Sequence, residues 1–193
     1  MTIHLLRHGK TVANENRLYC GRTDLPLSEA GAREIGLLGG EEIYPEADVL
    51  FSSGMLRADQ TLEIIYGNRE RIVVPELVEC DFGDFEMKSY EELKEQPDYR
   101  RWISDETGSV PCPGGESKNR VWERVLRGFN QVLEEARRQG AESAVVACHG
   151  GTIVCIMEHL LPNQKNFYEW QPQPGRGYSL LYAGEGHIAY KTI

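Results

Sequence analysis

The chain has 193 residues, a length that suits a single domain with one hydrophobic core. Its 21 basic and 30 acidic residues give a net charge of -9, which argues against a nucleic-acid binder and against docking on anionic membranes. No apolar run approaches the roughly 20 residues that span a bilayer, and Arg7 comes too early for a signal peptide. We therefore expect a single-domain cytoplasmic protein with neither a nucleic acid nor a membrane as its partner.

The first half of the chain alternates short apolar runs with helical segments. The run Ile3–Leu6 stops at Arg7-His8-Gly9 and is typical of a buried strand. Ser28 is placed to cap a helix that Gly39-Gly40 ends. The remaining predicted elements are strands over 48–51 and 72–75 and a helix over 55–66. This alternation predicts an α/β fold with a mainly parallel sheet.

Residues 80–115 interrupt the alternation and read as an insertion. Ser89 and Glu92 form a capping-box pattern for one short helix, and residues 98–104 suit another. Two interpretations carry equal weight: the insertion roofs a pocket, or it is an ordinary surface excursion.

The last third returns to regular elements. Ser117 is placed to cap a long helix that runs to about Arg138, and residues 144–148 form a strongly apolar strand pattern. That strand stops at His149-Gly150-Gly151, and a helix follows to residue 161. Residues 178–183 and 187–193, joined by Gly184-Glu185-Gly186, suit a terminal hairpin.

The cysteines give no sign of a disulfide framework or a zinc site. Their number is odd and no pair has C-x-x-C spacing, so we expect reduced thiols. The five are Cys20, Cys80, Cys112, Cys148 and Cys155.

Several candidate catalytic side chains follow strands, at the sheet edge where α/β proteins bind ligands. Two strands end in His-Gly, a third leads into a helix that begins near an arginine, and a fourth leads to two carboxylates. These residues are Arg7, His8, Arg57, His149, Glu76 and Glu79. The other histidines, His4, His159 and His187, are expected to be structural or on the surface.

This set of side chains suits phosphoryl transfer. Arginines match the charged oxygens of a phosphate ester, a neutral imidazole can attack phosphorus, and a carboxylic acid can protonate the leaving oxygen. Nothing in this chemistry requires a metal or cofactor. The cysteine-phosphatase loop, a D-x-D pair, a nucleotide P-loop and zinc motifs such as H-E-x-x-H are all missing from the sequence.

The ordered motifs resemble those of the histidine phosphatase superfamily. Leu6-Arg-His-Gly-Lys-Thr-Val-Ala-Asn14 is similar to its R-H-G-x-T/S-x-x-N opening, and residues 15–31 to its next block. Ser52-Ser-Gly-Met-Leu-Arg-Ala-Asp-Gln-Thr61 resembles S-S-x-x-x-R-A-x-Q-T. Leu77-Val-Glu-Cys-Asp-Phe-Gly83 resembles the acid/base block, and His149-Gly-Gly the late histidine.

The resemblance implies a role for each matching position. His8 would be the phosphorylated nucleophile, and Arg7, Arg57 and His149 would hold the phosphoryl group. Glu79 would donate the proton and later activate water. The phosphate pocket would also be lined by Asn14, Gly21 and the Gly150 amide.

The same resemblance implies a fold and a choice of activities. The fold would have three layers, a mostly parallel mixed sheet with helices on both faces, and a helical insertion (80–115) over the active site, all within one domain, 1–193. The family contains phosphatases and mutases. Hydrolysis is favoured because the chain is short and because Cys80 follows Glu79 where such mutases carry a basic residue.

Within the phosphatases, Pro113-Gly-Gly-Glu-Ser117 and the size resemble the branch that dephosphorylates alpha-ribazole 5'-phosphate in cobalamin biosynthesis. That branch tends to read W-E-G where this chain has Phe85-Glu86-Met87. The alternatives left open are a broad-specificity sugar-phosphate phosphatase, a phosphoglycerate mutase and a catalytically silent phosphate-binding module. A homodimer is one of the oligomeric states that the sequence leaves open.

Overall fold

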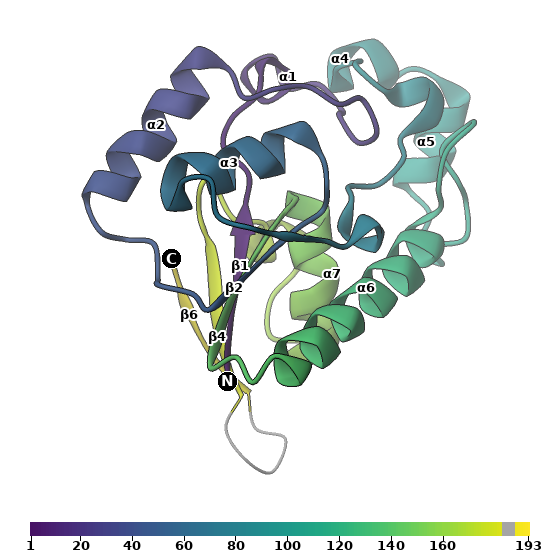
Figure 1. Cartoon of the computed structure of the whole chain (residues 1–193). Helices are drawn as coiled ribbons and strands as arrows, with labels where there is room; N and C mark the ends of the chain where they lie inside the picture. The colour runs from purple at the N-terminus through teal and green to yellow at the C-terminus, as the bar shows by residue number, and fades with distance from the viewer. Residues whose placement is uncertain (183–187) are drawn as a thin grey trace.

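The computed structural model describes residues 1–182 and 188–193. Its centre is a mixed six-stranded sheet in the order β3-β2-β4-β1-β5-β6 (Figure 1). The first four of these strands pair in parallel, whereas β5 and β6 pair antiparallel. The strands are β1 (Thr2–Arg7), β2 (Val49–Ser52), β3 (Ile72–Val73), β4 (Ser143–Cys148), β5 (Gly177–Tyr182) and β6 (Ile188–Thr192).

Helices cover both faces of this sheet, so the predicted three-layer α/β architecture is confirmed. Successive residues of a strand point to opposite faces, and the core divides accordingly. Leu6, Leu50 and Val145 pack with α3 (Leu56–Tyr66), next to which lies α2 (Glu29–Gly40). Leu5 and Val146 pack on the other face with α6 (Lys118–Arg138) and α7 (Gly150–Leu160).

The register of the central strands brings the two His-Gly motifs together. β1 and β4 run in parallel with Arg7 opposite Cys148, so His8 and His149 follow their strands at the same edge. Ser52, at the end of β2, pairs with Ala147. Three neighbouring strand ends therefore meet where the sequence predicted them to meet.

Some boundaries differ from the prediction. The third strand stops at Val73 because Pro75, which has no N–H to donate, begins the 3-10 turn η1 (Pro75–Leu77). Two four-residue helices were not expected, α1 (Val12–Glu15) and α8 (Phe167–Trp170), and a capping box begins each. β5 and β6 form the expected antiparallel hairpin, whereas its predicted turn, Gly184–Gly186, and the flanking Ala183 and His187 lie outside the described residues.

The insertion has a small apolar core of its own. It contains η2 (Gly83–Phe85), α4 (Tyr90–Leu93) with the expected Ser89 cap, and α5 (Pro97–Ile103). Phe85, Tyr99 and Trp102 are buried together, and the Tyr99 hydroxyl hydrogen-bonds that of Tyr19 at 2.5 Å. The aromatic contacts tie the insertion to the loop that follows β1 and α1.

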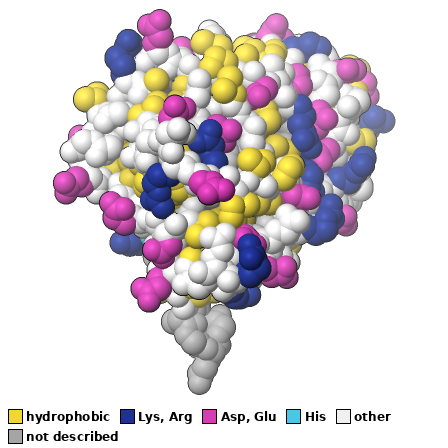
Figure 2. Space-filling view, viewed as in Figure 1, with side chains coloured by type: hydrophobic (Ala, Val, Ile, Leu, Met, Phe, Trp, Pro, Cys, Tyr) yellow, Lys and Arg dark blue, Asp and Glu magenta, His cyan; other side chains and the backbone are white. Residues whose placement is uncertain are grey.

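Acidic and basic side chains are interspersed over the face shown in Figure 2, and the described part of that face has no extended basic area. Within the described residues, no helix has the length and apolar character needed to cross a membrane. The five cysteines are unbonded.

Candidate active site

His8 lies directly after β1, and its backbone and ring are both held in place. Its backbone N–H donates to Cys148 O at 3.0 Å, which ties the ends of β1 and β4 together. Its ring Nδ1 lies 2.6 Å from Gly9 O, and Arg57 Nε donates to its Nε2 at 3.3 Å. Since a guanidinium only donates, Nε2 carries the lone pair and Nδ1 carries the proton. The nitrogen with the free electron pair therefore faces Arg57.

Arg57 is only 1% exposed, although it lies in the first turn of α3. The chain reaches it through a tight turn after β2 in which Gly54 has a φ of 82°, a conformation that favours glycine. Two carbonyl groups of the loop after α1 accept from its guanidinium: Gly21 O at 2.8 Å and Thr23 O at 3.1 Å. These bonds aim the third nitrogen, Nε, at His8.

His149 is fully buried at the N-cap of α7. Its ring lies edge-on to that of His8, with 5.1 Å between the ring centroids. The Nε2 atom is 2.9 Å from Ser53 Oγ, whereas Nδ1 has no hydrogen-bond partner among the described residues. A buried nitrogen without a partner is costly unless a ligand satisfies it.

Arg7 ends β1 and belongs to the same site as His8, Arg57 and His149. Its Nη1 donates to Pro172 O at 2.7 Å, in the segment between α8 and β5. Its Nε is buried and, within the part of the chain that the structure describes, is unpaired. Arg7 Nε and His149 Nδ1 are thus two unsatisfied buried nitrogens at one site.

Burial lowers the pKa of both histidines well below the ordinary value of 6.5, and the positive charges of Arg57 and Arg7 lower them further. Both imidazoles are therefore neutral at pH 7. Burial also lowers the pKa of Arg7, an effect that the charge of Glu79 partly offsets. The site combines two arginines with two neutral imidazoles, an arrangement complementary to an anion.

Glu79 holds its carboxylate between two backbone N–H groups. Cys80 N donates to Oε1 at 2.9 Å and Gly151 N donates to Oε2 at 3.0 Å, which places the carboxylate at the start of α7. A Cβ atom on Gly151 would lie 2.5 Å from Oε1, so a side chain at this position would displace the carboxylate. Of the two candidate carboxylates, Glu79 lies at the start of α7, the helix that His149 caps, whereas the Glu76 side chain begins against Gly128 on α6.

The three predicted pocket-lining residues have different environments. Gly150 lies against Arg7, with 3.3 Å between the position of a Gly150 Cβ and Arg7 Nε. Gly21 is tightly enclosed, and its N–H donates to Glu86 rather than into the pocket. Asn14 Oδ1 accepts from Thr11 N at 2.9 Å in the cap of α1. A phosphate contact from Asn14 or Gly21 stays a prediction.

Sequence reasoning missed several supporting residues. Glu86 accepts from the backbone N–H groups of residues 21, 22, 23 and 82, which fixes the loop that holds Arg57. Arg124 donates to the carbonyl groups of residues 76, 78 and 79 and pairs with Glu116 at 2.8 Å. Ser53 belongs to the predicted Ser52-Ser53 motif, but its contact with His149 was not predicted. Most of these contacts link residues at least 45 positions apart in sequence, so no local pattern indicates them.

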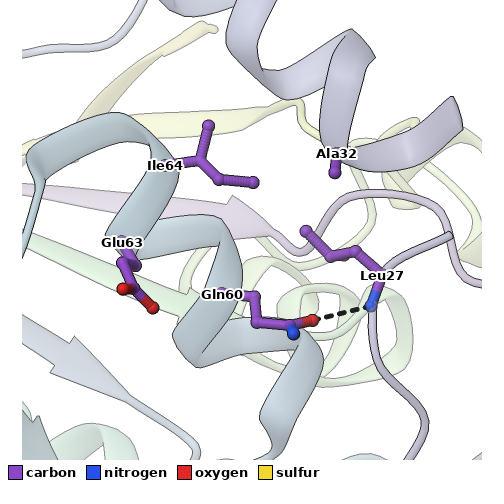
Figure 3. A pocket seen from close by; sticks show the side chains of 5 residues that line it. All are labelled: Leu27, Ala32, Gln60, Glu63 and Ile64. Carbon is purple, nitrogen blue, oxygen red and sulfur yellow. Dashed lines mark hydrogen bonds between the residues drawn. The ribbon is translucent and has the colours of Figure 1, made fainter. Parts of the chain in front are cut away.

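A separate hollow of about 250 Å³ lies between α2 and α3 (Figure 3). Leu27, Ala32 and Ile64 line it together with the Glu63 carboxylate, and Gln60 Oε1 accepts from Leu27 N at 2.8 Å. Because its charged lining group is anionic, this hollow does not suit a phosphate ester. Among the residues described, no three His, Cys, Asp or Glu side chains are grouped to hold a metal ion.

Known proteins share this fold and are similar to the chain in sequence. The chain is 28% identical over 165 residues to the adenosylcobalamin/alpha-ribazole phosphatase of Escherichia coli (strain K12), covering 83% of this chain and 79% of the relative. It is 30% identical over 172 residues to a 2,3-bisphosphoglycerate-dependent phosphoglycerate mutase of Nitrobacter winogradskyi, covering 83% and 82%. The solved alpha-ribazole phosphatase of Shigella flexneri superposes with a TM-score of 0.84 at 23% identity, covering 100% of this chain and 96% of that one.

The sequence model of the histidine phosphatase superfamily (branch 1) matches residues 3–192. The match contains both strand-end histidines, Arg57 and Glu79, which the fold brings to one edge of the sheet. The chain belongs to the histidine phosphatase superfamily.

Proposed function

We propose that this protein hydrolyses small phosphate monoesters without a metal ion, through a phosphohistidine intermediate on His8. One observation carries the proposal: the lone pair of a neutral, buried His8 faces the Arg57 guanidinium, next to two buried nitrogens, Arg7 Nε and His149 Nδ1, that have no partner among the described residues. A phosphoryl group supplies both an electrophile for the imidazole and oxygens for these donors.

In the first step, His8 Nε2 attacks phosphorus while the bond to the ester oxygen breaks. Glu79 transfers a proton to the departing oxygen, which leaves as an alcohol. Arg57 turns its Nε from the lone pair to a phosphoryl oxygen, and Arg7 Nε and His149 Nδ1 donate to the others. The Nδ1–H bond to Gly9 O holds the His8 ring in orientation as it becomes charged.

In the second step, water attacks the phosphohistidine. Glu79, now ionised, accepts a proton from this water, the P–N bond breaks with its electrons returning to His8 Nε2, and inorganic phosphate leaves. His8 and Glu79 are then restored to their starting protonation states. The arginines hold the phosphoryl charge in both steps, a role that metal ions fill in other phosphatases.

Hydrolysis is favoured over mutase exchange, although the similarity to the Nitrobacter winogradskyi mutase covers 82% of that relative. Chain length therefore separates the two activities only weakly. The remaining argument is Cys80, which follows Glu79 and contributes no charge for a second anionic group. Assays of phosphate release and phosphoglycerate isomerisation on the same preparation decide between the two.

For the substrate we propose alpha-ribazole 5'-phosphate or a similar small metabolite, as in the Escherichia coli relative. Met87, in place of the expected glycine, has a φ of 58° at the base of the insertion. A side chain there changes the segment that we expect to border the pocket. A panel of alpha-ribazole 5'-phosphate, sugar phosphates and phosphoserine identifies the preferred ester by kcat/KM.

We further propose that the protein works in the cytoplasm on small molecules, and that residues 80–115 roof the pocket of a single domain. The net charge of -9 supports a small-molecule partner over a nucleic acid.

The test of the mechanism is His8→Ala. With a radioactive phosphate ester and rapid quenching, the wild-type enzyme should yield an acid-labile labelled protein, and the variant should yield none and release no phosphate. His159→Ala, which removes an exposed histidine on α7, serves as the control and should retain both signals. A label that persists in His8→Ala would exclude His8 as the nucleophile.

A further inference from the structure

The segment that joins α8 to β5 is wrapped around Arg7. Arg7 donates from its side chain to Pro172 O at 2.7 Å and from its backbone to Arg176 O at 2.9 Å, and its own carbonyl accepts from Gly175 N at 3.0 Å. Gly177 cannot be replaced, because a Cβ there would lie 1.8 Å from Leu5 O. The segment is therefore fixed against the end of β1. Its first residue, Gln171, lies beside the sheet edge at which His8 and His149 follow their strands, which we call the catalytic edge.

The amide nitrogen of Gln171 shares the space in front of Gly150 with the guanidinium of Arg7. A Cβ built on Gly150 would lie 2.8 Å from Gln171 Nε2 and 3.3 Å from both Nε and Cζ of Arg7. Gly150 is the first residue of the eleven-residue helix α7, where backbone N–H groups lack partners within the helix. The Gln171 amide and the Arg7 guanidinium thus converge on one small volume at the start of α7.

Donors that face one another without an acceptor are unfavourable, so this arrangement calls for an acceptor between them. Arg7 Nε is buried, and among the described residues nothing accepts from it. An anionic oxygen placed there would accept from Arg7 Nε and from the Gln171 amide together. Glycine at position 150 leaves room for that oxygen, whereas any side chain would fill it.

We propose that Gln171 is a phosphoryl-binding residue, and that its side-chain amide donates to the same oxygen of the substrate as Arg7 Nε. This inference rests on the proposed function and adds to it a fourth donor to the phosphoryl group, after Arg57, Arg7 and His149. The amide contributes a directional hydrogen bond without adding charge, so it strengthens binding without raising the repulsion between cations. Hydrogen bonds to charged groups are stronger than those between neutral groups.

The test compares Gln171→Ala and Gln171→Glu with Gln173→Ala. Gln173 is a matched control, because it is the same residue type in the same segment with an exposed side chain. For each variant we would measure the Kd of inorganic phosphate and of vanadate by calorimetry, then kcat and KM for p-nitrophenyl phosphate. Circular dichroism and the melting temperature establish that each variant is folded.

Gln171→Ala should weaken phosphate and vanadate binding about 10-fold and lower kcat/KM about 10- to 100-fold, whereas Gln173→Ala should match the wild type. Gln171→Glu keeps the shape but puts a carboxylate against the phosphoryl oxygen, so it should weaken phosphate binding more than 100-fold. If Gln171→Ala does not fold, phosphate binding by Gln171→Glu decides whether Gln171 binds the phosphoryl group.

The proposal is overturned if folded Gln171→Ala binds phosphate as the wild type does, or if Gln171→Glu binds it equally well. Failure of the proposed function looks different. In that case the wild-type protein releases phosphate from no ester, while the calorimetric comparison of the variants still decides the role of Gln171.

Discussion

At the scale of single residues, the environment of Glu79 defines what its removal should do. Its two oxygens accept from Cys80 N and Gly151 N, so the carboxylate is fixed at the start of α7 before any substrate binds. Gln at this position could keep one of these bonds but cannot give up a carboxylic proton. The effect of the substitution therefore depends on how much the leaving oxygen needs that proton.

Glu79→Gln should slow phosphoenzyme formation about 100- to 10,000-fold with an alkyl phosphate, whose alkoxide is strongly basic. The loss should be much smaller with p-nitrophenyl phosphate, because nitrophenolate leaves readily as an anion. Single-turnover rates with both esters measure the difference. Glu76→Gln is the control and should change neither rate, since that side chain starts on the α6 side. Equal losses with the two esters would remove Glu79 as the acid.

The residues that could be predicted from sequence are those that follow strands. His8, Arg57, His149 and Glu79 stood out because glycines and strand ends mark them. Glu86 and Gln171 did not, because their contacts join segments at least 60 positions apart or depend on a loop whose path no local pattern fixes. The left-handed conformation of Met87 was also hidden, since methionine does not signal a positive φ.

At the scale of secondary-structure elements, β1 contains an ionisable group inside the sheet. His4 is 6% exposed, and its Nδ1 lies 2.8 Å from Ser179 Oγ on the neighbouring strand β5. Burial, helped by the nearby Lys191, lowers its pKa from 6.5 to about 4. The unfolded chain therefore takes up a proton at this residue at a higher pH than the folded protein does.

Because the pKa of His4 is lower in the folded state, its contribution to stability is full above pH 6.5 and is lost as the pH falls toward 4. His4→Gln should therefore show a smaller decrease in the free energy of unfolding between pH 7 and pH 4.5 than the wild type. Urea titrations at both pH values measure this. His159→Gln, at an exposed position on α7, should follow the wild type; a His4→Gln profile parallel to the wild type would contradict the assignment.

The regular elements were predictable because each has a local cause. Ser28 and Ser117 cap α2 and α6 through their side chains, and the apolar run of β4 is buried on both faces. The order of the strands was not available from such patterns. Only the pairing of β1 with both β4 and β5 shows that the last segment of the chain returns to the catalytic edge.

At the scale of the whole molecule, an oxyanion that binds the site should stabilise the fold. Vanadate should mimic the phosphoryl group in transfer, and at 100 times its Kd a ligand that binds only the folded state contributes about 2.7 kcal/mol. For a chain of this length that corresponds to a rise in Tm of about 5–10 °C. Differential scanning calorimetry with and without vanadate measures the shift.

The same measurement tests independence from metals. A chelator should change neither the Tm in the presence of vanadate nor the rate of ester hydrolysis, since Arg7 and Arg57 supply the positive charge. Arg57→Ala should lose most of the shift and serves as the control for binding in this site. Activity that a chelator removes and divalent ions restore would contradict the proposed chemistry.

The long-range hold on Arg7 also bears on how the enzyme is made. The guanidinium of Arg7 is held by a carbonyl 165 residues later in the chain, and the backbone of Arg7 is held by Gly175 and Arg176. A nascent chain that has emerged from the ribosome only as far as α7 contains both histidines and both arginines but cannot orient Arg7. The catalytic edge is therefore completed only after residues 172–176 have been synthesised and have emerged, and chains that stop before them should be inert toward phosphate esters.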